Sequence, residues 1–203
     1  MLKSRLVAGN ISTLLLVCLL LLFVPSSVSA GPQNQYDQVI ANCNQAIAAN
    51  PHDARVYLKR GIAYFHKGQY DLALNDYNQA IAINPQFTNA YVDRGNSYYR
   101  LGQYERAIAD YNQAITINPS DAEIYYDRGL LYSLLKQYDQ AIEDYNRAIA
   151  INPQFASAYY NKAWTCETIG RTQEAIGAYQ KFLTLASPQD TKRIEHAKQY
   201  IDK

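Results

Sequence analysis

The 203-residue chain has little of the material that metal and thiol chemistry require. It holds only three cysteines and three histidines, and their scattered positions exclude both the spacing of a zinc site and a disulfide framework. An excess of one charge is also missing, because 19 Lys and Arg face 18 Asp and Glu. A balanced chain lacks the strong field that attracts nucleic acid, so we exclude a nucleic-acid partner. What is abundant is tyrosine, with 19 copies against one Trp, and such a bias indicates one motif copied several times.

The first thirty residues differ in character from the rest. Lys3 and Arg5 precede an apolar run over residues 11–24, and small residues follow as far as Ala30. This order is typical of a signal peptide, so we predict a signal peptide over 1–30 with cleavage before Gly31. The apolar run is shorter than the roughly 20 residues that a membrane span needs. We therefore expect an exported protein, periplasmic or secreted, with no stable membrane span after cleavage; a membrane anchor formed by an uncleaved signal is the alternative.

The remaining sequence repeats with a period of 34. Four Asn-Pro pairs mark this period, with their prolines at Pro51, Pro85, Pro119 and Pro153. Residues 54–87 and 88–121 are identical at 17 of 34 positions. Such self-similarity indicates an array of one structural unit.

Each unit has the pattern of a helix, a tight turn and a second helix. Apolar and small residues recur at helical spacing of three and four, first over residues 57–64 and again over 73–81. Gly68 lies between the two stretches and can adopt the left-handed conformation that ends a helix. The Asn-Pro pair then ends the second helix, because proline lacks the amide proton and restricts the residue before it.

These residues resemble the tetratricopeptide repeat, which has conserved places for aromatic residues, glycine, alanine and proline over 34 residues. Three units fill all of those places. In the first unit they are Tyr57, Gly61, Tyr64, Ala73, Tyr77, Ala80 and Pro85. The resemblance implies an all-α fold, a right-handed α-solenoid of stacked antiparallel helix pairs with a C-terminal capping helix.

The same alignment divides the chain into segments. After the signal peptide, residues 31–53 form a linker and a single helix equivalent to half a repeat. The predicted repeats cover 54–87, 88–121, 122–155 and, in degenerate form, 156–189, and residues 190–203 form the capping helix. We expect Gly61, Gly95 and Gly129 to lie opposite the alanines of the second helix, so that the two helices of a unit can approach closely.

A charged pair recurs once per unit. Arginine precedes each of these glycines, at Arg60, Arg94 and Arg128, and aspartate precedes the second-helix aromatic, at Asp76, Asp110 and Asp144. We interpret these columns as a repeated ion pair that serves packing. A basic ladder for phosphate or nucleic acid is the alternative, and the matching aspartates argue against it.

By resemblance, the first helices line a concave groove that holds the ligand. This face is basic at its start and acidic in its middle, and it varies between otherwise similar units. Aromatic and charged side chains are typical of binding hot spots. The predicted partner-binding residues are Lys59, Phe65, Asp93, Asn96, Tyr99, Arg100, Glu123, Tyr126, Asp127, Tyr160 and Trp164.

No group of residues in the sequence resembles a catalytic site. His52, His66 and His196 fall in different layers of the predicted stack, and no nucleophile accompanies them. We therefore predict no catalytic residues, no metal and no cofactor. The expected function is a non-catalytic scaffold or adaptor of the cell envelope that binds a peptide or protein segment in the groove. A carbohydrate-binding solenoid that assists polysaccharide or envelope assembly is the alternative.

Overall fold

The computed structural model describes residues 32–202, which form ten helices and, within that range, no strand. The predicted signal peptide over 1–30 lies outside the described residues. In chain order the helices are α2 (Pro32–Ala49), α3 (Ala54–His66), α4 (Tyr70–Ile83), α5 (Thr88–Arg100), α6 (Tyr104–Ile117), α7 (Ala122–Leu134), α8 (Tyr138–Ile151), α9 (Ala156–Thr168), α10 (Thr172–Leu185) and α11 (Thr191–Ile201). None of them is long and apolar enough to cross a membrane.

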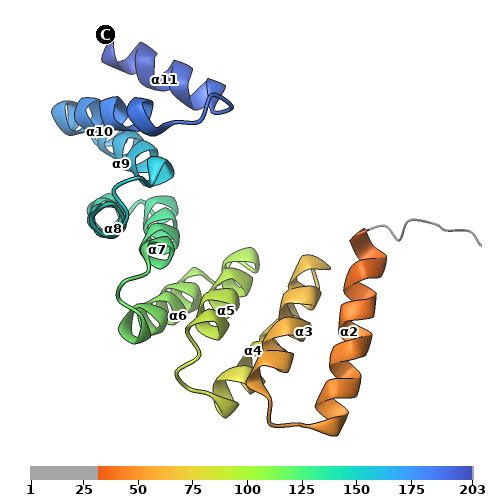
Figure 1. Cartoon of the computed structure of the whole chain (residues 1–203). Coiled ribbons are helices and arrows are strands. Elements are labelled where there is room, and N and C mark those ends of the chain that lie inside the picture. Colours follow the sequence, from red (N-terminus) through yellow and green to blue (C-terminus); the bar gives the residue numbers. More distant parts are fainter. Residues whose placement is uncertain (1–31, 203) are drawn as a thin grey trace, which may run out of the picture. The chain divides into compact units, whose positions relative to one another are not determined.

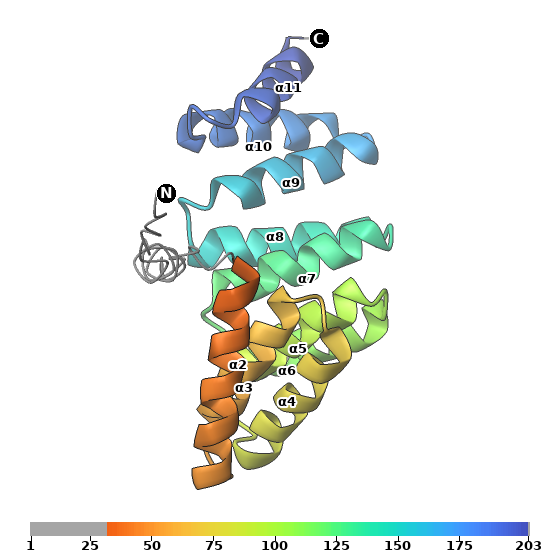
Figure 2. The same ribbon diagram turned by 90° about the vertical axis from the view of Figure 1, so that its right-hand side faces the viewer.

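Helices α3 to α10 form four antiparallel pairs, each made of a first and a second helix (Figure 1). Residues 36–202 belong to one compact unit, and every contact described below lies within it. A view from the side shows α7 to α11 following one another in layers (Figure 2). The capping helix α11 places the buried Ala197 against the core of α9 and α10. The predicted all-α solenoid of stacked helix pairs with a C-terminal cap is confirmed.

The turns within the units use the left-handed conformation that the sequence indicates. Gly68, Gly102 and Gly170 have φ angles of 72°, 73° and 76°. The third unit has Lys136 at the same place, with a φ of 60°, a conformation that a residue with a Cβ adopts less readily. The turn geometry is therefore kept even where the favourable residue is absent.

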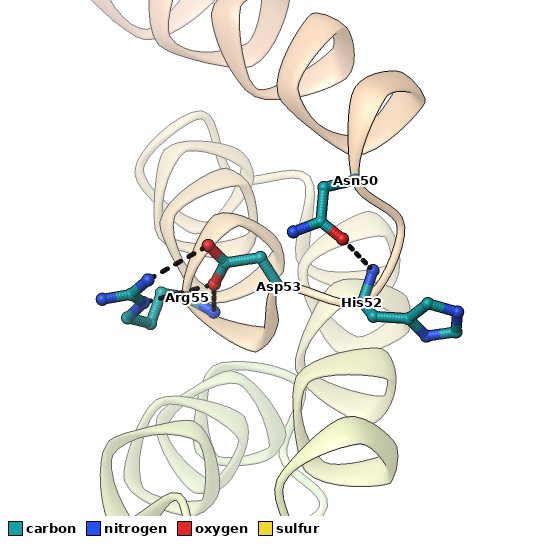
Figure 3. A network of polar contacts seen from close by, with 4 residues as sticks. All are labelled: Asn50, His52, Asp53 and Arg55. Carbon is teal, nitrogen blue, oxygen red and sulfur yellow. Dashed lines mark hydrogen bonds and ion pairs between the residues drawn. The ribbon is translucent and has the colours of Figure 1, made fainter.

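Side chains at the Asn-Pro junctions accept hydrogen bonds from backbone amides and so stabilise the start of the next helix. The Asp53 carboxylate accepts a hydrogen bond of 3.0 Å from the Arg55 backbone amide and so caps α3, as Figure 3 shows. The Asn50 side chain accepts a bond of 3.1 Å from the His52 amide in the same junction. A cap of this kind satisfies one amide that the first helical turn leaves unpaired.

The glycines of the first helices lie closest to tyrosine rings, which the expectation from sequence did not include; the expected alanine is also near at Gly95, where a Cβ would lie 3.4 Å from the Ala107 carbonyl oxygen. A Cβ at Gly61 would lie 2.6 Å from Cε1 of Tyr77, and one at Gly95 would lie 2.9 Å from Cε1 of Tyr111. Both tyrosines are buried. Glycine is needed at these positions because the tyrosine ring between the two helices leaves no room for a Cβ.

The charged columns form the predicted ion pairs, and the structural interpretation is confirmed. Arg94 donates two hydrogen bonds to Asp110, of 2.8 Å from Nε and 2.6 Å from Nη2. Its third nitrogen, Nη1, donates to Asn78 of the preceding unit at 2.7 Å. Arg60 and Arg128 repeat this arrangement. We call these contacts the arginine ladder; each of its steps joins two consecutive units through charge-assisted bonds.

Candidate binding groove

Three hollows follow one another along the first helices α3, α5 and α7. We call them together the groove. The first has a volume of about 230 Å³, the second about 140 Å³ and the third about 120 Å³. Asp93 lines the first two hollows and Asp127 lines the last two. The groove is therefore continuous, and these two carboxylates lie where its hollows meet. Its other lining residues include Ile62, Phe65, Val92, Asn96, Tyr99, Glu123 and Leu130.

Asp93 and Asp127 differ from the aspartates of the arginine ladder because no cation neutralises them. Among residues 32–202 neither side chain has a hydrogen-bond or ion-pair partner. Burial raises the pKa of Asp93 to about 6. Burial, reinforced by the negative charges of Glu123 and Asp121, raises the pKa of Asp127 to about 6. A cation bound nearby would stabilise the charged form of both carboxylates, which their surroundings disfavour.

Large apolar side chains lie beside these carboxylates. Tyr99 is 45% exposed and Leu130 is 39% exposed, and both line the hollow that contains Asp127. Trp164 is 46% exposed on the next first helix, α9. Apolar surface next to an unpaired charge can bind a ligand that carries both kinds of group.

Two of the predicted binding residues are instead engaged in packing. The Tyr126 ring lies 4.8 Å from the Phe155 ring, and its hydroxyl accepts a hydrogen bond of 2.9 Å from Asn161. The Tyr160 ring lies 5.0 Å from the ring of Phe182. Substitution of either tyrosine would therefore change the stability of the fold as well as the surface of its helix.

Three further predicted residues have partners within the chain. The Phe65 ring packs edge-on against Tyr70, with 5.4 Å between centroids. Arg100 lies over the same Tyr70 ring at 5.7 Å, and Asn96 accepts a hydrogen bond of 2.6 Å from Tyr111. These contacts orient the walls of the groove.

Lys59 lies apart from the acidic part of the groove. It lines a hollow of about 290 Å³ between α2 and α3, which we call the N-terminal hollow and which shares Ile62 with the first hollow of the groove. The walls are mainly apolar, and Arg55 and Lys59 are its charged residues. The complete lining is Tyr36, Val39, Arg55, Leu58, Lys59, Ile62 and Ala63.

A cluster around His196 was not foreseen from the sequence. Its Nδ1 lies 3.4 Å from the hydroxyls of both Tyr160 and Tyr179, and Tyr179 donates a hydrogen bond of 2.6 Å to Glu167. The cluster joins α11 to α9 and α10, so it fixes the capping helix. No regular spacing in the sequence links residues 160 and 196, because the last unit departs from the 34-residue period. Within residues 32–202 no three His, Cys, Asp or Glu side chains are arranged to hold a metal ion.

Comparisons with known proteins assign the repeats to a family. A family model described as "TPR repeat" matches residues 61–102 and 95–136. Two models described as "Tetratricopeptide repeat" match 122–155, and 42–75 with 144–177. No curated protein matches the chain.

Several solved structures resemble this one. The crystal structure of MamA has 26% identity and a TM-score of 0.70, covering 81% of this chain and 92% of its own. YrrB, described as a TPR protein with an unusual peptide-binding site, has 20% identity and a TM-score of 0.68, with 82% and 84% coverage. TTC0263, a thermophilic TPR protein in Thermus thermophilus, has 24% identity and a TM-score of 0.62, with 83% and 91% coverage. The last two likenesses show the fold alone.

Proposed function

Because this chain belongs to the tetratricopeptide repeat family, we propose that it is a non-catalytic scaffold that binds a peptide or protein segment in the groove. Proteins built from such repeats are generally non-catalytic scaffolds, and the resemblance to MamA covers most of both chains. The observation that carries the proposal is the pair of half-buried, unpaired carboxylates, Asp93 and Asp127, beside exposed apolar side chains.

The groove suits a segment in which a lysine or arginine is followed by an apolar residue. The cation would lie between Asp93 and Asp127, where the two carboxylates line one hollow. The apolar side chain would contact Tyr99 and Leu130 in the adjoining hollow. The predicted residue Glu123 lines the acidic hollow and would strengthen the attraction for a cation.

A pull-down with the chain as bait from its own cell-envelope extract tests this proposal. The substitution Asp127→Asn should reduce the captured partner strongly, since it removes the charge and keeps the shape. Glu143→Gln is the matched control, because Glu143 is an exposed acid on the second helix α8. Equal capture by both variants and the unchanged chain would exclude the groove as the binding site.

The pH dependence of partner capture is a second test of the same site. Capture should weaken as the pH falls through about 6, because Asp93 and Asp127 then bind protons and no longer attract a cation. The Asp127→Asn variant should lose part of this dependence. Capture that is unchanged between pH 5 and pH 8 would contradict the role of the carboxylates.

We further propose that the protein works in the cell envelope, after cleavage of the predicted signal peptide. Amino-terminal sequencing of the protein from its own cells should give Gly31 as the first residue. A start at Met1 would contradict cleavage and favour the membrane-anchored alternative.

The exposed rings of Tyr99 and Trp164 keep a carbohydrate ligand as a second candidate, because such rings can stack on sugars. Salt separates the two candidates. Binding of a basic segment to Asp93 and Asp127 should weaken between about 50 and 500 mM salt, since ions screen partly exposed charges. Stacking of a sugar should not change over that range.

A further inference from the structure

The two ends of the helix stack differ in a way that points to a second binding surface. Helix α2 is equivalent to the second helix of a unit. Its Asn44 accepts a hydrogen bond from Arg60, just as Asn78 of the second helix α4 accepts one from Arg94. No described helix takes the place of the first helix that would pair with α2. The described stack therefore begins with half a unit.

Within the part of the chain that the structure describes, the face of α2 where a first helix would pack is only partly covered. In the four pairs, the second-helix positions equivalent to Val39 and Ala46 are fully buried. They are Ala73, Ala107, Ala141 and Ala175 for Val39, and Ala80, Ala114, Ala148 and Phe182 for Ala46. On α2, Val39 is only partly buried and Ala46 is exposed. Cys43 lies between them at the place of Tyr77 and is 3% exposed, so the apolar face that every other pair covers is open to solvent at Val39 and Ala46 only.

Helix α3 has an uncovered face beside it. Ala90, Ile124 and Ala158 occupy one column of the first helices, and all three are buried. Val56 occupies the same column in α3 and is only partly buried. The N-terminal hollow lies between the two open faces, where Val39 of α2 meets Leu58 and Ile62 of α3.

A second copy of this chain does not fit the place. Its only unpaired first helix among the described residues is α11, which begins 35 residues after α9 rather than 34. Its His196 contacts the Tyr160 hydroxyl as Asn161 contacts that of Tyr126. This register places Lys198 in the column of Gly61, the column that faces the second helix of the same unit. A lysine in that column disfavours the packing of α11 from a second copy onto α2, because burying its unpaired charge against an apolar face is costly.

The preceding segment of the chain does not fit either. Helix α2 begins at Pro32, one turn earlier than the other second helices, so it is helical at the positions where the units have their turn. Residues 1–31 also contain no acidic residue. They could not complement the two cations beside the hollow, Lys59 and Arg55, of which Arg55 is exposed and also bonded to Asp53.

We propose that the N-terminal hollow and the open face of α2 bind an amphipathic helix of a partner protein, with an apolar stripe and acidic residues beside it. This helix takes the place of a first helix that residues 32–202 do not supply. Its apolar stripe covers Val39, Ala46 and Ile62, and its acidic residues face Arg55 and Lys59. The interaction goes beyond binding in the groove, because it uses α2 and completes the first pair of the stack.

A peptide from the chain itself is a suitable probe. Residues 121–135 contain α7, a first helix with Asp121, Glu123 and Asp127 together with the buried residues Ile124 and Leu131. Fluorescence anisotropy of this labelled peptide, titrated with the full chain, should show saturable binding. The double substitution Arg55→Glu with Lys59→Glu should weaken it at least tenfold, and the peptide with Glu123→Lys and Asp127→Lys should regain affinity for that variant.

Two substitutions on α2 separate the proposed face from the rest of the helix. Ala46→Glu places a charge on the open face and should weaken binding of the peptide at least tenfold. Ala48→Glu is the matched control, because Ala48 and its equivalents Ala82, Thr116 and Ala150 are all exposed. Since both alanines are exposed, both variants should fold. Equal effects of the two substitutions, or no binding of the peptide, would overturn the proposal.

Further arms of the experiment identify other occupants. Loss of peptide binding with Asp127→Asn in the protein would place the peptide in the groove and overturn the proposal without affecting the proposed function. Self-association of the unliganded chain that Ala46→Glu abolishes would make a second copy the occupant. Binding by a chain that starts at Gly31 but not by the full chain would make residues 1–30 the occupant. Either result would overturn a partner helix.

Discussion

The close contact between Gly61 and Tyr77 allows a prediction in which two effects of one substitution oppose each other. Replacing a helical glycine by alanine usually stabilises a protein, by up to about 1 kcal/mol, because alanine has the higher helix propensity. At Gly61 the new Cβ would lie 2.6 Å from Cε1 and 2.9 Å from Cδ1 of Tyr77. The ring is 1% exposed, so its neighbours leave it no room to move away. Overpacking of this kind costs about 1–3 kcal/mol.

Gly177 in α10 provides the matched control. It is an exposed glycine, and a Cβ there would have no atom within 4 Å. Gly61→Ala and Gly177→Ala share the gain in propensity, so the difference between them measures the overpacking alone. We expect Gly177→Ala to raise the melting temperature and Gly61→Ala to lower it. A free-energy difference of about 1–3 kcal/mol corresponds to roughly 2–12 °C for a domain of this size.

Thermal unfolding followed by circular dichroism measures both variants. If Gly61→Ala raises the melting temperature as much as Gly177→Ala, the close packing described for α3 and α4 is wrong. A double substitution adds a second check. In a Tyr77→Leu background the ring is absent, so Gly61→Ala should no longer be destabilising, and the two substitutions should show a coupling of opposite sign to their separate effects.

Three further predictions follow from the charges and thiols. Asp110→Ala should cost about 3–5 kcal/mol in urea unfolding, because it leaves Arg94 half-buried without its carboxylate; a loss below about 1 kcal/mol would contradict the arginine ladder as a source of stability. Asp127→Asn should stabilise the unliganded chain at pH 8 but not at pH 3. The pKa of Asp127 is about 6 in the folded chain and lower in the unfolded chain, so the original chain loses stability as the pH rises through about 6. Cys43 and Cys166 should stay unreactive toward Ellman's reagent until the chain unfolds, since both are buried and burial raises their pKa.

The fold could be predicted from the sequence because each position recurs in several units, so that its residue type can be compared between them. The Asn-Pro pairs and the glycine and alanine columns recur at one period, and each has a simple local meaning. The partner of a glycine could not be predicted in this way. Gly61 is four positions from Tyr57 and sixteen from Tyr77, and only the crossing of α3 over α4 decides which ring it meets.

The same limit applies to the groove. The resemblance to the tetratricopeptide repeat implied which side of each first helix faces it, but neither the exposure of Tyr99 nor the packing of Tyr126 against Phe155 has a signal in the spacing. Both are aromatic residues on the groove side of a first helix. Their different exposures depend on the loop before α9, which brings Phe155 next to Tyr126 within the same unit. The one-residue shift of α11 likewise follows from the loop before it and moves Lys198, rather than Ala197, into the glycine column.

The column that contains Asp93 and Asp127 shows why we connect these carboxylates to binding rather than to stability. The fourth unit has Asn161 at the same place, and this neutral side chain donates a hydrogen bond to Tyr126. The fold therefore does not require a charge in the column. An unpaired carboxylate that is half-buried destabilises the unliganded chain, since its surroundings raise its pKa to about 6. A ligand cation would remove this penalty on binding, so the same charges that weaken the free protein would strengthen its complex.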